Sequence, residues 1–262
     1  MDLVIKDINT LGQKDGYYSI LDDKAIYKVK DEEKINICEN TNAYVIDNSI
    51  NKNIEINVSK NSNLKYIVLG SKNTKRVFNV LGNLNYVEIS LDETSENLIV
   101  NLLDQDSKFE GKTLSIAKNY NTCFIQRVNH DNKKTDSNIS NYGVAMSGAT
   151  ISFDTTGFIE KGNNKSNCRQ LSRGVIMDNE SNVTSKPILL INEFDCFANH
   201  GAAIGKMSDE DLFYLMSRGL TKNEAFLLIL KGIIRPFIDE LVLDELKNDI
   251  DLKVNELVYK EQ

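Results

Sequence analysis

Apolar residues follow two different patterns along this 262-residue chain, and the pattern changes near Gly205. From about residue 35 to residue 192 they form brief runs of strand length, each bounded by Asn, Ser, Asp, Gly or Lys. After Gly205 they recur every three or four residues, which is the spacing of one helix face. The pattern predicts a mainly β fold with a small α appendage, divided into a β core over residues 1–206 and a helical region over residues 207–262.

The spacing of the strand-like runs favours a solenoid over a sandwich. The centres of five successive runs recur about every 11 residues, as expected of an all-β array with tight corners; they are Ile56, Ile67, Val77, Ile89 and Ile99. An antiparallel sandwich favours Asn-Gly or Asp-Gly hairpins, yet the one such pair in the sequence, Asp15-Gly16, lies near the N-terminus. In a solenoid each coil buries its inward side chains on its neighbours, so short strands suffice. We therefore predict a right-handed parallel β-helix, preceded by an opening segment over residues 1–30 with one or two strands around an Asp22-Asp23 turn.

Composition narrows the class of protein. Hydrophobic residues make up 41% of the chain, and no apolar run approaches the roughly 20 residues that span a bilayer. The sequence shows no basic segment followed by an apolar one, so a signal peptide is not expected and a cytoplasmic location is. The net charge of −7 disfavours a nucleic-acid partner. With 32 Asn and only two Pro, the corners are expected to use Asn.

The helical region carries start and stop signals. The segments SDED (208–211) and TKNE (221–224) are N-terminal capping patterns, and Gly219 between them suits a helix end. Pro236 is expected to kink or break the second helix near Arg235, because proline lacks a backbone donor. These helices are too small to stand alone, so we expect them to pack on the end of the β region or on a partner.

Two motifs at the junction carry a resemblance to a known family. They are the His-Gly-Ala-x-x-Gly segment of residues 200–205 and LFYLMSRGL of residues 212–220. With their surroundings from Gly157 to Glu240, about a third of the chain, they resemble the C-terminal part of the SufB/SufD family. The chain looks SufD-like and, compared with typical members, shortened at the N-terminus.

The resemblance implies a subunit of the SUF iron–sulfur cluster assembly machinery that acts as a scaffold rather than an enzyme. In that family a β-helix core is followed by a helical region that docks a SufC ATPase. The β-helix end pairs with another SufB or SufD subunit, as a homo- or heterodimer, and an iron–sulfur cluster is held transiently at that interface. The sequence contains no Walker-type GxxxxGK[ST] loop, so an ATP-driven step would need a separate chain.

The resemblance also selects candidate ligands. His200 falls on the histidine of the SufD-type segment CSHGAT, which makes it a candidate metal ligand at the subunit interface, while Ala198 and Asn199 stand in place of the Cys and Ser. Cys196 and Cys168 are further candidates for holding the cluster. If the chain is extended, Cys196 and His200 lie about 13 Å apart, so a bend or a second subunit would be needed for both to reach one metal ion. The alternative for His200 is a hydrogen-bonded cap of the strand-to-helix junction.

The remaining cysteines and the SufB-type positions qualify this set. In SufB-type sequences a cysteine follows Gln and a glutamate follows the histidine, and here Leu171 and Gly201 occupy those positions. Cys168 alternates with Gln170 and Ser172, which predicts a shared polar face. The four cysteines form no CxxC pair, and the other two, Cys38 and Cys123, are expected to be buried packing residues.

The first predicted helix supplies candidate contacts to the ATPase. They are Leu212, Phe213, Tyr214 and Arg218. Core packing is the alternative for Phe213 and Tyr214. For Arg218 the alternative is hydrogen bonding to carbonyls at the end of its own helix.

A carbohydrate-active β-helix enzyme, such as a polysaccharide lyase or hydrolase, is the rival function. Such enzymes need clustered carboxylates on adjacent coils, and the β region offers no concentrated set. Tryptophan, the commonest platform for sugar rings, is absent. An inert structural solenoid would fit the β region but leaves the helical motifs unexplained.

Overall fold

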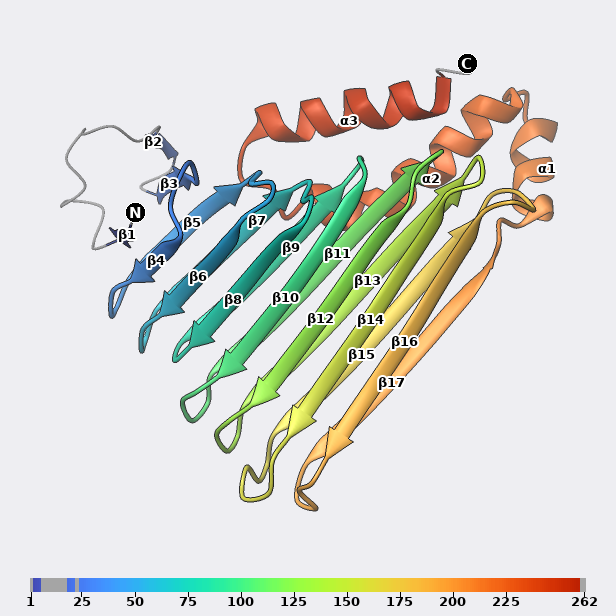
Figure 1. Cartoon of the computed structure of the whole chain (residues 1–262). Helices are drawn as coiled ribbons and strands as arrows, with labels where there is room; N and C mark the ends of the chain where they lie inside the picture. Colours follow the sequence, from blue (N-terminus) through green and yellow to red (C-terminus); the bar gives the residue numbers. More distant parts are fainter. Residues whose placement is uncertain (1, 6–17, 22–23, 260–262) are drawn as a thin grey trace.

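A computed structural model (Figure 1) describes residues 2–5, 18–21 and 24–259. The chain alternates between two sheets from β4 to β17, so each coil contributes one strand to each sheet. The eight-stranded sheet has the order β1 (Asp2–Ile5), β4 (Lys34–Ile37), β6 (Asn53–Val58), β8 (Thr74–Val80), β10 (Thr94–Leu102), β12 (Thr122–His130), β14 (Thr150–Ile159) and β16 (Asn182–Ile191). The nine-stranded sheet has the order β17 (Phe197–Lys206), β15 (Asn167–Ile176), β13 (Asp136–Met146), β11 (Lys108–Lys118), β9 (Asn83–Ser90), β7 (Asn63–Leu69), β5 (Asn42–Asp47), β3 (Lys24–Lys28) and β2 (Tyr18–Leu21).

The strand pairing confirms the predicted parallel β-helix fold. The pairs from β3 onward are parallel, while β2 and β3 form an antiparallel pair at the start. The predicted turn residues 22 and 23 between them lie outside the described part of the chain. The five predicted run centres fall in the successive strands β6 to β10, so the 11-residue interval is half of one coil.

The coils widen along the chain. From β4 onward in the eight-stranded sheet, the paired residues Ile35 and Ile56 of β4 and β6 are separated by 21 residues, whereas Gly157 and Leu189 of β14 and β16 are separated by 32. The strands lengthen from four residues in β4 to ten in β14. The structure therefore broadens from its N-terminal coils toward β16 and β17 (Figure 1).

Asparagine has two roles in this architecture, and both follow from its short amide side chain. Five asparagines at corners have positive φ, as the composition predicts: Asn40, Asn51, Asn61, Asn73 and Asn119. Five others stack in register on the outer face of the eight-stranded sheet, where each amide nitrogen donates to the preceding amide oxygen: Asn36, Asn57, Asn79, Asn101 and Asn129. This asparagine ladder satisfies polar groups on five consecutive strands.

The space between the sheets holds a group of ionisable residues among apolar and aromatic ones. We call it the interior charge cluster; it consists of Asp47, Arg76, Glu88 and Glu96, all at most 2% exposed. The Arg76 guanidinium donates to Asp47 at 2.7 Å and to Glu96 at 2.6 Å. Sequence alternation places Arg76 on the same face as Phe78 and Val80, which point inward.

The cluster is held in place by hydroxyl groups. Tyr66 donates to Asp47 at 2.6 Å, and Tyr86 donates to Glu88 at 2.9 Å. Burial and the nearby Glu96 carboxylate raise the pKa of Glu88 well above its usual range. The cluster therefore contains one cation paired with two carboxyl groups, Asp47 and Glu96, and a third carboxyl group, Glu88, whose ionisation is disfavoured by burial.

Three helices follow the β-helix: α1 (Asp209–Ser217), α2 (Lys222–Ile238) and α3 (Asp244–Tyr259). The predicted caps are present, because Ser208 accepts from the Asp211 amide and Thr221 forms a capping box with Glu224. Of the kink or break predicted near Arg235, the break is wrong, since α2 continues through Pro236 to Ile238. Pro236 lies in the last turn, where few helical bonds remain to be lost.

The position of the helical region also differs from expectation. α2 and α3 pack on the outer face of the nine-stranded sheet rather than on the end of the β region. Their buried side chains meet outward-facing apolar residues of the sheet, including Ile67, Val87 and Leu114. At the end of α2, Glu240 pairs with Lys112 and, at 2.6 Å, with Lys65.

Candidate functional site

The last coil of the β-helix is open on one side. β16 and β17 lie at the edges of their sheets, with no further described strand beside either. Large apolar side chains of this coil are exposed: Ile188, Leu190, Phe194, Phe197 and Ile204. An exposed edge with apolar side chains is a surface on which another chain can pair.

His200 lies on β17, in register with Gln170 on β15. Gln170 is buried and faces inward, so His200 points to the same inner side, but it is exposed because no described coil covers it. The Oε1 atom of Gln170 has no hydrogen-bond partner, although its Nε2 donates to the Ile188 carbonyl at 3.3 Å. At the open end, the His200 imidazole therefore lies next to Gln170, whose Oε1 atom can still accept a hydrogen bond.

Cys168 lies one strand deeper, at 1% exposure, and is in register with Ala198. A strand separation of about 4.8 Å and a rise of about 3.3 Å per residue put its Cα about 8 Å from that of His200. Burial raises the pKa of the Cys168 thiol, and a hydrogen bond with Ser137 opposes this only in part. Cys168, Gln170 and Ser172 share one face, as their alternation predicts, and that face points into the β-helix.

Cys196 precedes β17 and is half-buried. Its Sγ donates to the Glu193 carbonyl at 3.2 Å. Burial and the carboxylates of Glu193 and Asp195 raise the pKa of the Cys196 thiol above its ordinary value. The structure thus places His200 and Cys196 in the last coil and Cys168 on the neighbouring strand β15, and burial of the two cysteines disfavours the thiolate form that binds iron.

The described residues contain no group of three or more His, Cys, Asp or Glu side chains that could hold a metal ion. His200 alone cannot complete a coordination shell, so any cluster bound there would need ligands from elsewhere. The prediction that Cys38 and Cys123 are buried is wrong, since both are half-exposed. Cys123 faces outward because it alternates with the inward-facing Thr122 and Phe124.

Sequence reasoning missed the second histidine. His130 is fully buried, with Nδ1 2.7 Å from the Thr135 hydroxyl and Nε2 2.8 Å from the Ser137 hydroxyl. Burial lowers its pKa to about 4, so the ring is neutral. Ser137 is also the register partner of Cys168 on β15, so His130 and Cys168 have a neighbouring side chain in common. The sequence signal was the alternation of His130 with Gln126 and Val128 on one face of β12.

The candidate docking residues lie on α1, which has no buried residue. Phe213 is 74% exposed and Tyr214 is 56% exposed, so the core-packing alternative for this pair is wrong. The Arg218 guanidinium stacks over the Tyr214 ring at 5.2 Å. Leu212 is half-buried. Only Met207 and Ser208 separate α1 from the end of β17.

None of the described helices combines the length and the apolar character needed to cross a bilayer.

Comparison with known proteins finds one matching family model and several related sequences. A family model described as "SUF system FeS cluster assembly, SufBD core domain" matches residues 14–233. The iron–sulfur cluster assembly protein SufD of Bacillus subtilis is 33% identical over 160 residues, which cover 61% of this chain and 36% of that protein. A SufBD family protein of Mycobacterium bovis is 33% identical over 151 residues, covering 55% and 18%, and one of Staphylococcus saprophyticus is 27% identical over 205 residues, covering 73% and 43%. The chain thus spans less than half the length of each of these relatives.

Proposed function

The chain belongs to the SufBD family of the SUF iron–sulfur cluster assembly system, and from this premise we propose that it is a scaffold subunit acting in the cytosol without catalysis of its own. The observation that supports a scaffold role is the open last coil, where β16 and β17 leave unpaired edges beside exposed apolar side chains and His200. A surface of this kind suits assembly with another subunit. The iron–sulfur cluster is then cargo that is built and passed on.

The proposed partner at the last coil is another SufB- or SufD-type subunit, in a homo- or heterodimer. Phe194 is 98% exposed and Leu190 is 45% exposed, and pairing would remove both from water. We expect the double variant Phe194→Ser and Leu190→Ser to reduce dimer formation in sedimentation velocity, with the chain alone and with a SufB-type subunit. Ile50→Ser is the matched control, because Ile50 is 58% exposed on an early coil. Unchanged pairing in the double variant would contradict this assignment.

His200 is the proposed ligand that this subunit contributes to a cluster at the interface. Its exposed imidazole on the edge strand can reach a metal shared with ligands of a second chain, and Cys168 and Cys196 would take part only if the partner lowers the pKa of their thiols. We expect His200→Ala to lower iron and sulfide content after anaerobic reconstitution of the assembled complex. Asn199→Ala is the control, since Asn199 is exposed on the opposite face of the strand. Equal cluster content in the parent and His200→Ala would remove His200 from the site.

The SufC-type ATPase is the proposed partner of α1. Phe213, Tyr214 and Arg218 are its exposed candidate contacts and Leu212 is a half-buried one. A force applied to α1 would reach β17 through a two-residue connection. ATP-driven dimerisation of the ATPase could in this way shift the strand that carries His200. α2 and α3 are fastened to the nine-stranded sheet and are expected to move less.

Co-purification with a SufC-type ATPase tests this contact. We expect the double variant Phe213→Ser and Tyr214→Ser to lose the ATPase while keeping the parent circular dichroism spectrum. Leu252→Ser is the control, because Leu252 is 62% exposed and lies on a different helix, α3. Retention of the ATPase by the double variant would show that docking occurs elsewhere. These point variants test the contact more specifically than deletion of residues 207–244, because the deletion would also expose the apolar face of the sheet.

The rival carbohydrate-active function finds no support at the carboxylates that come together in the fold. Asp47, Glu88 and Glu96 lie inside the β-helix and are at most 2% exposed, so they cannot reach a polysaccharide. Measurable cleavage of an acidic polysaccharide would nevertheless overturn the scaffold proposal.

A further inference from the structure

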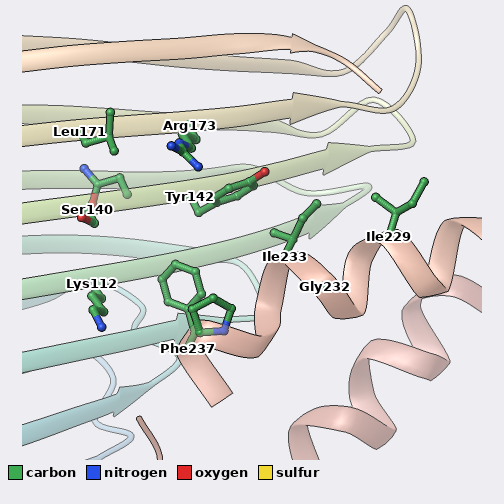
Figure 2. A pocket seen from close by; sticks show the side chains of 11 residues that line it. Lys112, Ser140, Tyr142, Leu171, Arg173, Ile229, Gly232, Ile233 and Phe237 are labelled. Atoms are coloured by element: carbon green, nitrogen blue, oxygen red, sulfur yellow. The ribbon is translucent and has the colours of Figure 1, made fainter. Parts of the chain in front are cut away.

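An open groove lies between α2 and the outer face of the nine-stranded sheet (Figure 2). We call it the α2 groove; it has a volume of about 530 Å³. One wall is formed by Ile229, Ile233 and Phe237 of α2, and the other by outward side chains of β11, β13 and β15. A volume of this size lies within the range of about 300–1,000 Å³ typical of small-molecule sites.

The groove exists because α2 lacks side-chain volume where it faces these strands. A Cβ atom at Gly232 would have no heavy atom within 4 Å, so this turn of the helix leaves a gap. Pro236, one turn later, also lines the groove and has no backbone N–H to donate to the Gly232 carbonyl. The apolar side chain of Leu171 on the opposite wall is 39% exposed.

The sheet wall of the groove carries two cations, Lys112 and Arg173, and among the described residues only Lys112 of the two has an ion pair. Lys112 pairs with Glu240, which is also bound by Lys65 at 2.6 Å, so this carboxylate is already compensated. Arg173 lines the groove from β15 and has no ion pair or hydrogen bond to any described residue. It lies near Tyr142, since burial raises the pKa of Tyr142 and the charge of Arg173 opposes that rise.

A free guanidinium beside an apolar wall defines a specific chemistry. Arginine pairs with carboxylate, sulfonate or phosphate oxygens through a planar fork, and Arg173 is exposed and so accessible to such a group. We propose that the α2 groove binds a small organic anion with an apolar body, whose acidic group pairs with Arg173 and whose apolar part lies against Ile233 and Phe237. The site is on the outer side of β15, whereas His200 faces the inner side of β17, so this binding goes beyond the proposed scaffold role and is independent of it.

The fluorescent anion 8-anilinonaphthalene-1-sulfonate is a suitable probe for a titration of the full chain. We expect saturable binding to the parent and at least about tenfold weaker binding to Arg173→Gln, because a bond to a charged group is lost. Arg169→Gln is the matched control: Arg169 lies on the same face of the same strand, stacked over Phe197 and outside the groove. The neutral analogue N-phenyl-1-naphthylamine is expected to bind the parent about tenfold more weakly than the sulfonate.

Filling the groove provides a second, independent test. Gly232→Leu should abolish saturable binding, and Gly232→Ala should retain it, while both keep the parent far-ultraviolet circular dichroism spectrum. The proposal is overturned if the parent shows no saturable binding, if Arg173→Gln or folded Gly232→Leu binds like the parent, or if the neutral analogue binds as tightly as the sulfonate. Stoichiometric displacement of the probe by a SufC-type ATPase would also overturn it, because the groove would then be a protein interface.

Discussion

Replacing Arg76 by Met removes the one cation of the interior charge cluster while keeping an apolar stem of similar length. Arg76 is fully buried and donates to Asp47 at 2.7 Å, to Glu96 at 2.6 Å and to the Ser71 hydroxyl at 2.9 Å. Without it two buried carboxyl groups lose their counter-charge. Breaking a buried ion pair in this way costs about 3–5 kcal/mol of folding free energy. We expect the variant to be destabilised by that amount at pH 7.

The pH dependence gives the sign of the effect and a check on its size. Burial alone would raise the pKa of Asp47, but the charge and hydrogen bonds of Arg76 lower it below its ordinary value of 3.8. In the parent, this stabilisation is therefore present above pH 3.8 and is lost as the pH falls. In the variant the pKa of Asp47 is raised, so stability is lost as the pH rises instead. At about 1.36 kcal/mol per pH unit, the difference in destabilisation between pH 5 and pH 7 is at most about 2.7 kcal/mol for one carboxyl group.

Urea denaturation followed by far-ultraviolet circular dichroism measures this free energy, since the chain has no tryptophan to report on unfolding. Lys186→Met is the control: it breaks an exposed pair with Asp154 at 3.5 Å, and surface pairs contribute about 0–1 kcal/mol. A destabilisation of Arg76→Met no larger than that of the control, or one that does not increase between pH 5 and pH 7, would refute the reasoning.

Further substitutions test other parts of the interior and the outer face. Glu88→Gln should leave stability unchanged near pH 4 and increase it at pH 7, because burial raises the pKa of Glu88 and the parent loses stability as the pH rises above 4.5; urea titrations at both pH values check this. Gly157→Ala should destabilise by about 1–3 kcal/mol, since its Cβ would lie 2.4 Å from the Cys168 sulfur, and a melting point equal to the parent's would contradict that geometry. Asn79→Ala interrupts the asparagine ladder by removing two side-chain hydrogen bonds of 2.9 Å, so it should lower the free energy of unfolding by about 1 kcal/mol. An unchanged urea midpoint would show that the ladder adds no stability.

The features that depend on local chemistry could be predicted from the sequence. The capping patterns at Ser208 and Thr221 and the use of Asn at corners each depend on a few neighbouring residues, and the structure has all of them. The solenoid followed from the 11-residue interval because that interval is half a coil. The family resemblance identified the last coil and α1 as the places to examine.

The features that depend on distant residues could not be predicted. The run RVFNV around Arg76 has apolar residues on both faces, since Phe78 points inward and Val77 outward, so alternation did not reveal a buried arginine.

Runs that are apolar on both faces indicate strands covered on both sides. In the nine-stranded sheet the covering layer is α2 and α3, which follow more than 100 residues after the strands of the early coils. The α2 groove likewise arises only where Gly232 meets β13 and β15.

The open last coil also bears on how the β-helix holds together. In a solenoid each coil is stabilised only by its neighbours, and a terminal coil without a capping layer loses half of that support. The inward face of β17 lies next to buried Gln170 and Cys168, yet it is itself exposed. Amide hydrogen exchange is thus expected to be fastest in β16 and β17 among the long strands, and slowest in the central coils. A second subunit seated on this edge would act as the missing cap, so that assembly and the rigidity of the strand carrying His200 would rise together.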